Sequence, residues 1–161
     1  MDYCIYASVR TGGIQGRGIN NCLLQICLSY GMSPSVKDGS WSLIGRLIDE
    51  RNTPAMKMLI DLSNVCDIKR RISDAILRPC HDILEILISK TRQFLRADDK
   101  YTRYALTYGD RKSLRMLLQA GALIPARAYV KINDPDFTEK TKLLDDYHFQ
   151  VVADSNGIHT N

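Results

Sequence analysis

The fold is decided by residues 101–122, YTRYALTYGDRKSLRMLLQAGA. Gly109 and Asp110 divide this stretch into two short segments. Leucines and a methionine recur in the second segment at helical spacing, which gives that segment one apolar face. Gly121 stands where the C-terminus of a helix favours a residue with a left-handed backbone. The stretch therefore predicts two short helices that fold back on each other.

The leucine-rich second helix has three weaker counterparts earlier in the chain. Leu114 heads the segment LRMLLQ, and the matching segments are LQICLSYG, MKMLID and LEILIS. We call the first residues of these four segments the anchor residues: Leu24, Met56, Leu84 and Leu114. The steps between them are 32, 28 and 30 residues, and similarity at such a period is typical of repeated helical hairpins. Nine positions before each anchor, the first helix is expected to place an inward residue: Gln15, Leu47, Ala75 and Ala105.

The last hairpin resembles an ankyrin repeat. The ankyrin pattern around a leucine-rich helix is followed at three places: Ala105, Gly109 and the closing pair Gly121 and Ala122. Gly109 stands at the corner, which is the turn between the two helices of the hairpin. The resemblance covers roughly residues 10–125 and implies an all-α fold, an α-solenoid of about four stacked helix-turn-helix repeats. We therefore expect a single domain over residues 1–161, with units at 10–33, 41–65, 69–96 and 99–124 and a C-terminal cap at 125–150.

The chain departs from the ankyrin pattern at the start of each unit and at two corners. The usual threonine-proline-leucine-histidine start is replaced by residues 100–103, KYTR, in the last unit. The corner glycine is replaced by Arg51 in the second unit and by Pro79 in the third. Proline cannot continue a helix, so Pro79 is expected to end the first helix of its unit. We expect less regular turns than in a consensus ankyrin array.

Local signals place the other helices. Helical patterns predict helices over residues 20–31, 41–50, 53–62, 67–78, 83–96 and 138–149. Ser40 is expected to cap the second of these helices. Thr53 is expected to cap the third, with Pro54 at its first helical position.

Composition indicates the charge of a partner and the cellular compartment in which the protein works. The net charge of +4 is unevenly spread, because residues 66–130 carry +6 and residues 131–161 carry −3. A basic middle segment favours an acidic partner surface or an internal contact with the acidic tail. Five cysteines without paired spacing argue against a disulfide framework and for a reducing compartment. We find no apolar run of membrane-spanning length and no Sec signal peptide, and we expect a cytoplasmic protein or one exported by a pathogen into host cytosol.

The ankyrin resemblance implies a non-catalytic module that binds another protein. In that family, binding uses the turn tips and the exposed side of the first helices. The predicted partner-binding residues are Asp49, Glu50, Arg70, Arg71, Arg78, Arg103, Thr107 and Tyr108. Tyrosine and arginine often dominate the energy of such interfaces. We expect a partner with an acidic patch, no cofactor and no metal. Degenerate units of this kind are similar to those of poxviral host-range proteins and secreted bacterial effectors, which implies a host partner and a role in target recognition.

Two alternatives remain open from the residues alone. A nucleic-acid-binding domain would use the basic middle segment, in which Lys69, Arg70 and Arg71 form a short cationic run. A small enzyme would use Cys80 and His81, although adjacent residues on a helix point in different directions. The glycine-rich loop at residues 12–18, GGIQGRG, lacks the lysine and serine or threonine of a phosphate-binding P-loop.

Overall fold

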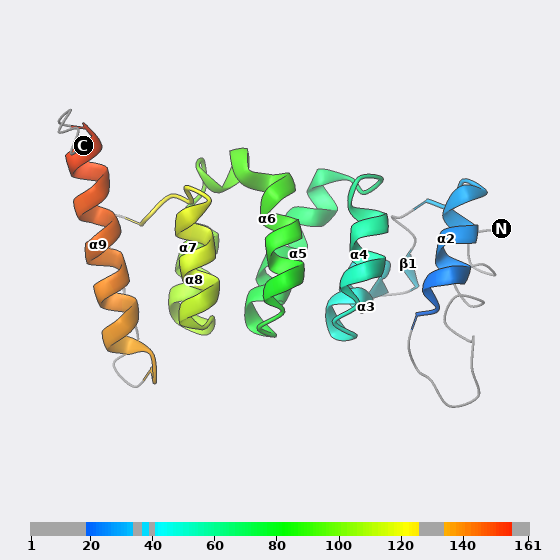
Figure 1. The fold of residues 1–161 in the computed structure, drawn as a ribbon, viewed down its shortest axis with the longest axis horizontal. Helices are drawn as coiled ribbons and strands as arrows, with labels where there is room; N and C mark the ends of the chain where they lie inside the picture. The colour runs from blue at the N-terminus through cyan, green and yellow to red at the C-terminus, as the bar shows by residue number, and fades with distance from the viewer. Residues whose placement is uncertain (1–18, 34–36, 39–40, 126–133, 156–161) are drawn as a thin grey trace. The chain divides into compact units, whose positions relative to one another are not determined.

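The computed structural model describes residues 19–33, 37–38, 41–125 and 134–155. Within these residues the protein is all-α, which confirms the predicted fold class at this level (Figure 1). The helices are α2 (Asn21–Ser29), α3 (Leu43–Asp49), α4 (Thr53–Ile60), α5 (Val65–Leu77), α6 (His81–Leu95), α7 (Lys100–Tyr108), α8 (Arg111–Gln119) and α9 (Phe137–Ser155). Two short antiparallel strands, β1 (Lys37–Asp38) and β2 (Trp41–Ser42), precede α3. None of the described helices combines the length and apolarity needed to cross a membrane.

The chain divides into two compact units, residues 1–91 and residues 92–161. In the first unit, α3 packs against both α4 and α5, and α2 packs against α4. In Figure 1, α4 and α6 lie in front of α3 and α5 within this unit. In the second unit, α8 packs against both α7 and α9. The expectation of a single repeat domain over the whole chain stays a prediction.

The four helices that carry the anchors, α2, α4, α6 and α8, begin in the same register, and we call them the second helices. Each starts directly after a residue that stands four positions before its anchor: Asn20, Asn52, Cys80 and Asp110. The backbone N–H of every anchor donates to the carbonyl of that residue, at 2.8 to 3.1 Å. In three cases the side chain also caps the helix, since Asn20, Asn52 and Asp110 accept a hydrogen bond from the backbone N–H three residues later.

The four anchor residues are fully buried, each with 0% of its surface exposed. Leu47, Ala75 and Ala105, nine residues earlier in the last three hairpins, are also fully buried. Burying a leucine or methionine side chain contributes about 1.5–3 kcal/mol to folding. The inward positions predicted from the period are therefore confirmed for the described residues, and Gln15 lies outside them.

Two second helices end on a glycine with a left-handed backbone. Gly31 has a φ of 83° and Gly121 a φ of 79°. In both cases the next residue closes the helix end, because Met32 donates to the carbonyl of Cys27 and Ala122 to that of Leu117, each at 3.0 Å. The predicted left-handed cap at Gly121 is confirmed.

Three boundary predictions have clear outcomes. Thr53 is not the cap of α4, because Asn52 accepts from the backbone N–H of Ala55 at 3.1 Å and Thr53 is the first helical residue. The cap of α3 is Ser42, whose hydroxyl accepts from Gly45 at 3.1 Å, and Ser40 lies outside the described residues. The prediction for Pro79 is confirmed, since α5 ends at Leu77.

Helix α9 is held against the corner between α7 and α8. The ammonium group of Lys140 donates to the carbonyl of Gly109, the C-cap of α7, at 2.6 Å. The carboxylate of Asp136 accepts from the backbone N–H of Arg111, the first residue of α8, at 3.0 Å. A cation therefore lies at the C-terminus of one helix and an anion at the N-terminus of the next, where the helix dipoles favour them.

Candidate functional site

The predicted partner-binding residues fall into two groups, one in each compact unit. The first unit carries Asp49, Glu50, Arg70, Arg71 and Arg78, and the second carries Arg103, Thr107 and Tyr108. Three of them share one register position, six residues before an anchor: Glu50, Arg78 and Tyr108. That position is at or next to the C-terminal end of each first helix. The prediction that both groups form one docking face stays a prediction.

The two carboxylates of the first unit are engaged within the protein. Glu50 accepts from the Nε atom of Arg46 at 2.6 Å and from the backbone N–H of Ile19 at 2.7 Å. It thereby ties the end of α3 to Ile19, two residues before α2. Asp49 forms an ion pair with Arg78, which follows α5. We therefore assign Asp49 and Glu50 a structural role at this corner in addition to any contact with a partner.

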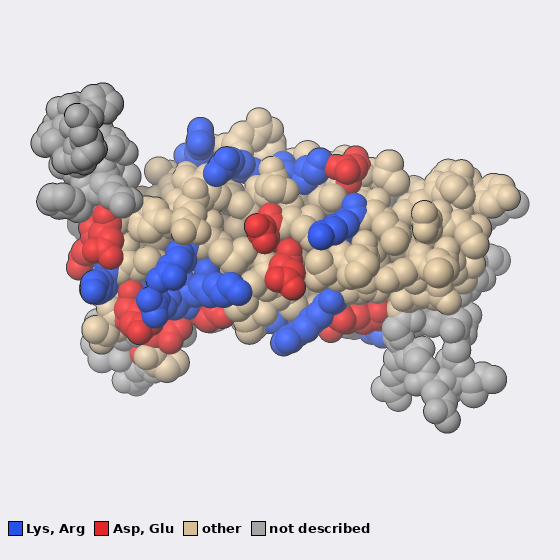
Figure 2. Space-filling view, in the orientation of Figure 1, with Lys and Arg blue, Asp and Glu red and all other residues tan. Residues whose placement is uncertain are grey.

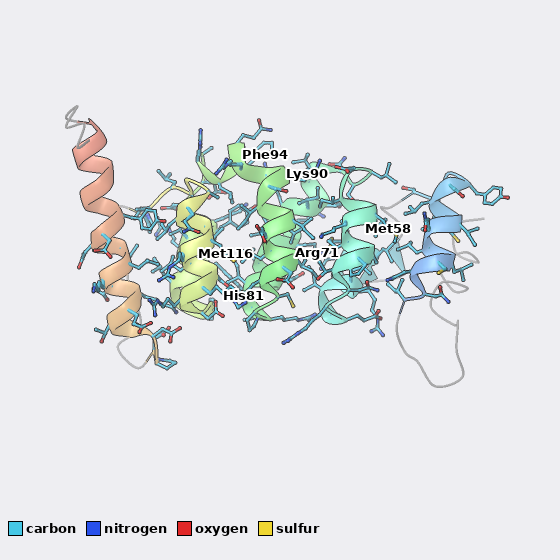
Figure 3. All side chains as sticks on the ribbon, viewed as in Figure 1. Met58, Arg71, His81, Lys90, Phe94 and Met116 are labelled. Atoms are coloured by element: carbon cyan, nitrogen blue, oxygen red, sulfur yellow. The ribbon has the colours of Figure 1, made fainter. Side chains whose placement is uncertain are left out.

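The cations of the first unit differ in how available they are. Arg71, labelled in Figure 3, pairs with Asp74 one turn along α5 at 2.8 Å, and its guanidinium lies close to Gly45 of α3. Arg78 is 46% exposed at the side chain despite its ion pair with Asp49. Arg70 is exposed and makes no hydrogen bond or ion pair within the described part of the chain. Arg70 and Arg78 are thus the cations of this group that a partner can reach most easily.

An apolar side chain accompanies these cations. Leu77, the last residue of α5, is 50% exposed and stands directly before Arg78. Such exposure gives no stability to the isolated chain, and a contact with a partner would remove this surface from water. The second half of α5 and its C-cap therefore combine one exposed leucine with two accessible arginines.

The group in the second unit lies on α7. Arg103 forms two hydrogen bonds with the carboxylate of Asp99, at 2.9 and 2.6 Å, and this contact lowers the pKa of Asp99. The hydroxyl of Thr107 donates to the carbonyl of Arg103 at 2.9 Å. Tyr108 is 56% exposed, and its ring lies 4.9 Å from that of Tyr104 in a tilted arrangement. Two aromatic rings and one paired guanidinium therefore share the exposed side of α7.

Cys80 has a structural environment at the corner between α5 and α6. Its thiol donates to the carbonyl of Ile48 at 3.4 Å and to that of Arg78 at 3.2 Å. Burial raises the pKa of this thiol above its ordinary value. A buried neutral thiol is a weak nucleophile, because the thiolate is the reactive form. These contacts favour a role for Cys80 in holding the corner together.

The remaining thiols, histidines and carboxylates form no metal-binding cluster among the described residues. Cys22, Cys27, Cys66 and Cys80 carry free thiols. Within the described ranges, no three histidines, cysteines or carboxylates are placed so that they could hold a metal ion. The glycine-rich loop at residues 12–18, Cys4 and His159 lie outside the described residues, as do the side chains of Trp41 and His148.

Sequence reasoning missed one set of exposed residues in the first unit. Ile26 of α2 is 52% exposed, Tyr30 at the C-cap of α2 is 87% exposed, and Leu62, two residues after α4, is 57% exposed. A signal was present, because Tyr30 and Leu62 each stand six residues after an anchor and Ile26 stands two residues after one. Ile26 lies two residues after Leu24 on the same helix, which places it on the opposite side from that buried anchor.

Comparisons with known proteins give no relative. No protein-family model, no curated protein and no solved structure matches this chain.

Proposed function

We propose that the chain is a divergent ankyrin-like solenoid that binds another protein and catalyses no reaction. Three regularities support the repeat interpretation: the common start register of the second helices, the buried anchors and the glycine caps at Gly31 and Gly121. A stack of such hairpins leaves the ends of its first helices exposed in successive units. The residues at these exposed helix ends can therefore determine which partner the stack binds.

The observation that carries this proposal is the exposure of Leu77 between Arg70 and Arg78. Leu77 is 50% exposed, and the two arginines present cationic groups on the same helix and at its end. Arginine tolerates burial at interfaces because its guanidinium is weakly hydrated and forms paired hydrogen bonds with carboxylates. The partner that fits this surface is a protein with a small apolar depression bordered by aspartates or glutamates.

The test is a quantitative pull-down from cell extract that compares the wild type with two paired substitutions. Arg70→Glu with Leu77→Ser alters the first-unit surface, and Arg103→Glu with Tyr108→Ala alters the second-unit surface. Lys142→Glu is the control, because Lys142 is exposed on α9 and makes no hydrogen bond or ion pair with another described residue. We expect the first pair to lose the partner, and we expect Lys142→Glu to retain it.

Two results would argue against the chosen surface. If both paired variants capture the same proteins as the wild type in the same amounts, the ends of the first helices do not contact the partner. If only the second pair loses the partner, the contact lies on α7 and the first-unit assignment is wrong.

Nucleic-acid binding is the alternative that the basic middle segment suggested. Many of these cations already have carboxylate partners: Arg71, Arg78, Lys90, Lys100, Arg103 and Arg111. Charges that are neutralised within the protein contribute less to counterion release from a phosphate backbone. Affinity for unrelated DNA or RNA sequences that falls steeply with salt would favour this alternative over protein binding.

A further inference from the structure

The second helices of the first unit carry a separate exposed surface. Two residues after each anchor stand Ile26, Met58 and Ile86, and six residues after each anchor stand Tyr30, Leu62 and Lys90. We call these two sets the apolar rows, although Lys90 ends the second one. On the face seen in Figure 2, charged side chains are sparse over α2 and α4. Figure 3 labels Met58 on α4 and Lys90 on α6.

The residues within each apolar row come from three helices or their C-terminal ends, and these helices are neighbours. Asn52 donates from its side-chain amide to the side-chain carbonyl of Asn21 at 2.8 Å, which joins the starts of α2 and α4. Lys90 of α6 forms an ion pair with Asp61, the C-cap of α4, which joins the far end of α4 to α6. The exposed side chains on these helices therefore form one surface.

This surface is bordered by two opposite charges at one register position. Lys57 on α4 and Glu85 on α6 each stand one residue after an anchor, and both are exposed. Neither makes a hydrogen bond or ion pair with another residue in the described part of the chain. They stand beside two half-buried apolar residues, Met58 and Ile86. The surface thus carries a cation, Lys57, on α4 and an anion, Glu85, at the same register position on α6.

We propose that this surface pairs with the same surface of a second copy of the chain. A two-fold axis parallel to α4 and α6, and between them, places α4 of one copy against α6 of the other. Lys57 then faces Glu85 of the second copy twice, once on each side of the axis. The same operation places Met58 against Ile86 and Leu62 against the methylene stem of Lys90. The charge pattern is thus complementary to itself, which selects a second copy as the occupant.

The expected dimer is reversible. A standard stable interface buries about 800 Å² on each partner. The exposed sides of two short helices supply less than this area, so we expect association in the micromolar range. The surface is distinct from the ends of the first helices, and it is independent of the proposed function.

The experiment measures the self-association of the full chain by sedimentation velocity over a range of concentrations. Lys57→Glu places two glutamates opposite each other, and Glu85→Lys places two lysines opposite each other. We expect each single variant to lower the association constant by about tenfold, because like charges replace two opposite-charge contacts. Lys142→Glu is the matched control on α9, with the same change of charge at an exposed residue outside this surface, and we expect it to dimerise like the wild type.

A mixture supplies the decisive comparison. Lys57→Glu chains and Glu85→Lys chains in equal amounts restore both opposite-charge contacts, so the mixture should associate as tightly as the wild type. The double variant carrying both changes should also recover. A wild type that is monomeric at every concentration, single variants that dimerise normally, or a mixture no tighter than its components would each overturn the proposal. The pull-down from cell extract is expected to be unaffected by Lys57→Glu, which separates this test from that of the proposed function.

Discussion

The ammonium group of Lys140 lies 2.7 Å from the Oδ2 atom of Asp134, and the side chain of Lys140 is fully buried. The same ammonium group donates to the carbonyl of Gly109 at 2.6 Å. A buried charge with these partners is satisfied, whereas removing one partner leaves the other uncompensated. The hydrogen bond from Lys140 to Gly109 therefore fixes the position of α9 on the corner between α7 and α8.

Substitution of Lys140 should strongly destabilise the second unit. We expect Lys140→Ala to lower the free energy of unfolding by about 3 kcal/mol, since it leaves Asp134 and the carbonyl of Gly109 without their cation. Lys142→Ala, two residues further along α9 at an exposed site, should change it by less than about 0.5 kcal/mol. Urea unfolding followed by circular dichroism measures both. Equal effects of the two substitutions would show that the buried contact contributes nothing specific.

Asn52 should contribute more to stability than its counterpart Asn20. Both side chains cap a second helix, but only Asn52 also donates to Asn21, at 2.8 Å. We expect Asn52→Ala to cost about 2 kcal/mol and Asn20→Ala about 1 kcal/mol. Thermal or urea unfolding of the two variants measures the difference. Asn52→Asp keeps the cap and removes the donor, so its cost should lie between zero and that of Asn52→Ala.

Two residues with a left-handed backbone should respond to substitution in opposite directions. Gly121 has a φ of 79° and Arg51 a φ of 53°. A side chain costs about 1 kcal/mol in this conformation, so Gly121→Ala should destabilise the protein and Arg51→Gly should stabilise it. Melting temperatures measured side by side test the pair. A lower melting temperature for Arg51→Gly would mean that the arginine side chain contributes more than its backbone strain costs.

The reactivity of Cys80 should depend on pH in a defined direction. Burial raises the pKa of its thiol, so at a given pH it has less thiolate than an unfolded cysteine. We expect alkylation of Cys80 to be slower than that of the exposed Cys22 and Cys66, and to rise at higher pH. Mass spectrometry after timed labelling distinguishes the sites.

The same shift links Cys80 to stability. The folded protein holds the thiol proton of Cys80 more tightly than the unfolded chain does. The protonated thiol therefore contributes in full to the free energy of unfolding below the ordinary pKa of cysteine. The contribution declines as pH rises above that value towards the folded pKa. Cys80→Ala should therefore flatten the loss of stability at alkaline pH. An alkaline limb that is unchanged in this variant would assign the loss to another group.

The positions of the inward residues could be predicted because they depend on spacing alone. Leucine and methionine at steps of 28 to 32 residues identify Leu24, Met56, Leu84 and Leu114, and all four are fully buried. Helix ends were less predictable, because neighbouring residues compete to cap. Asn52 and Thr53 are both good caps, and the structure uses Asn52, whose side chain also reaches Asn21. The strands β1 and β2, two residues each, are too short to leave a periodic signal.

Roles that depend on distant partners could not be predicted from local pattern. Glu50 was expected to face a partner, yet it accepts from Ile19, a residue 31 positions earlier. Lys140 lies in the polar run TEKTK, which reads as a solvated helix face, although it is fully buried. In both cases the sequence indicates a charged residue and the fold decides whether it faces solvent or the interior.

The shared start register of the second helices makes the chain a candidate for shortening by recombination. Asn52 and Cys80 occupy the same register position, and each precedes a second helix directly. Removing residues 53–80 would join Asn52 to His81, so that the asparagine would cap α6 while α3 supplied the first helix of a hybrid hairpin. A chain built in this way should stay helical and unfold cooperatively, whereas a deletion of similar length that shifts Leu84 by one residue should not.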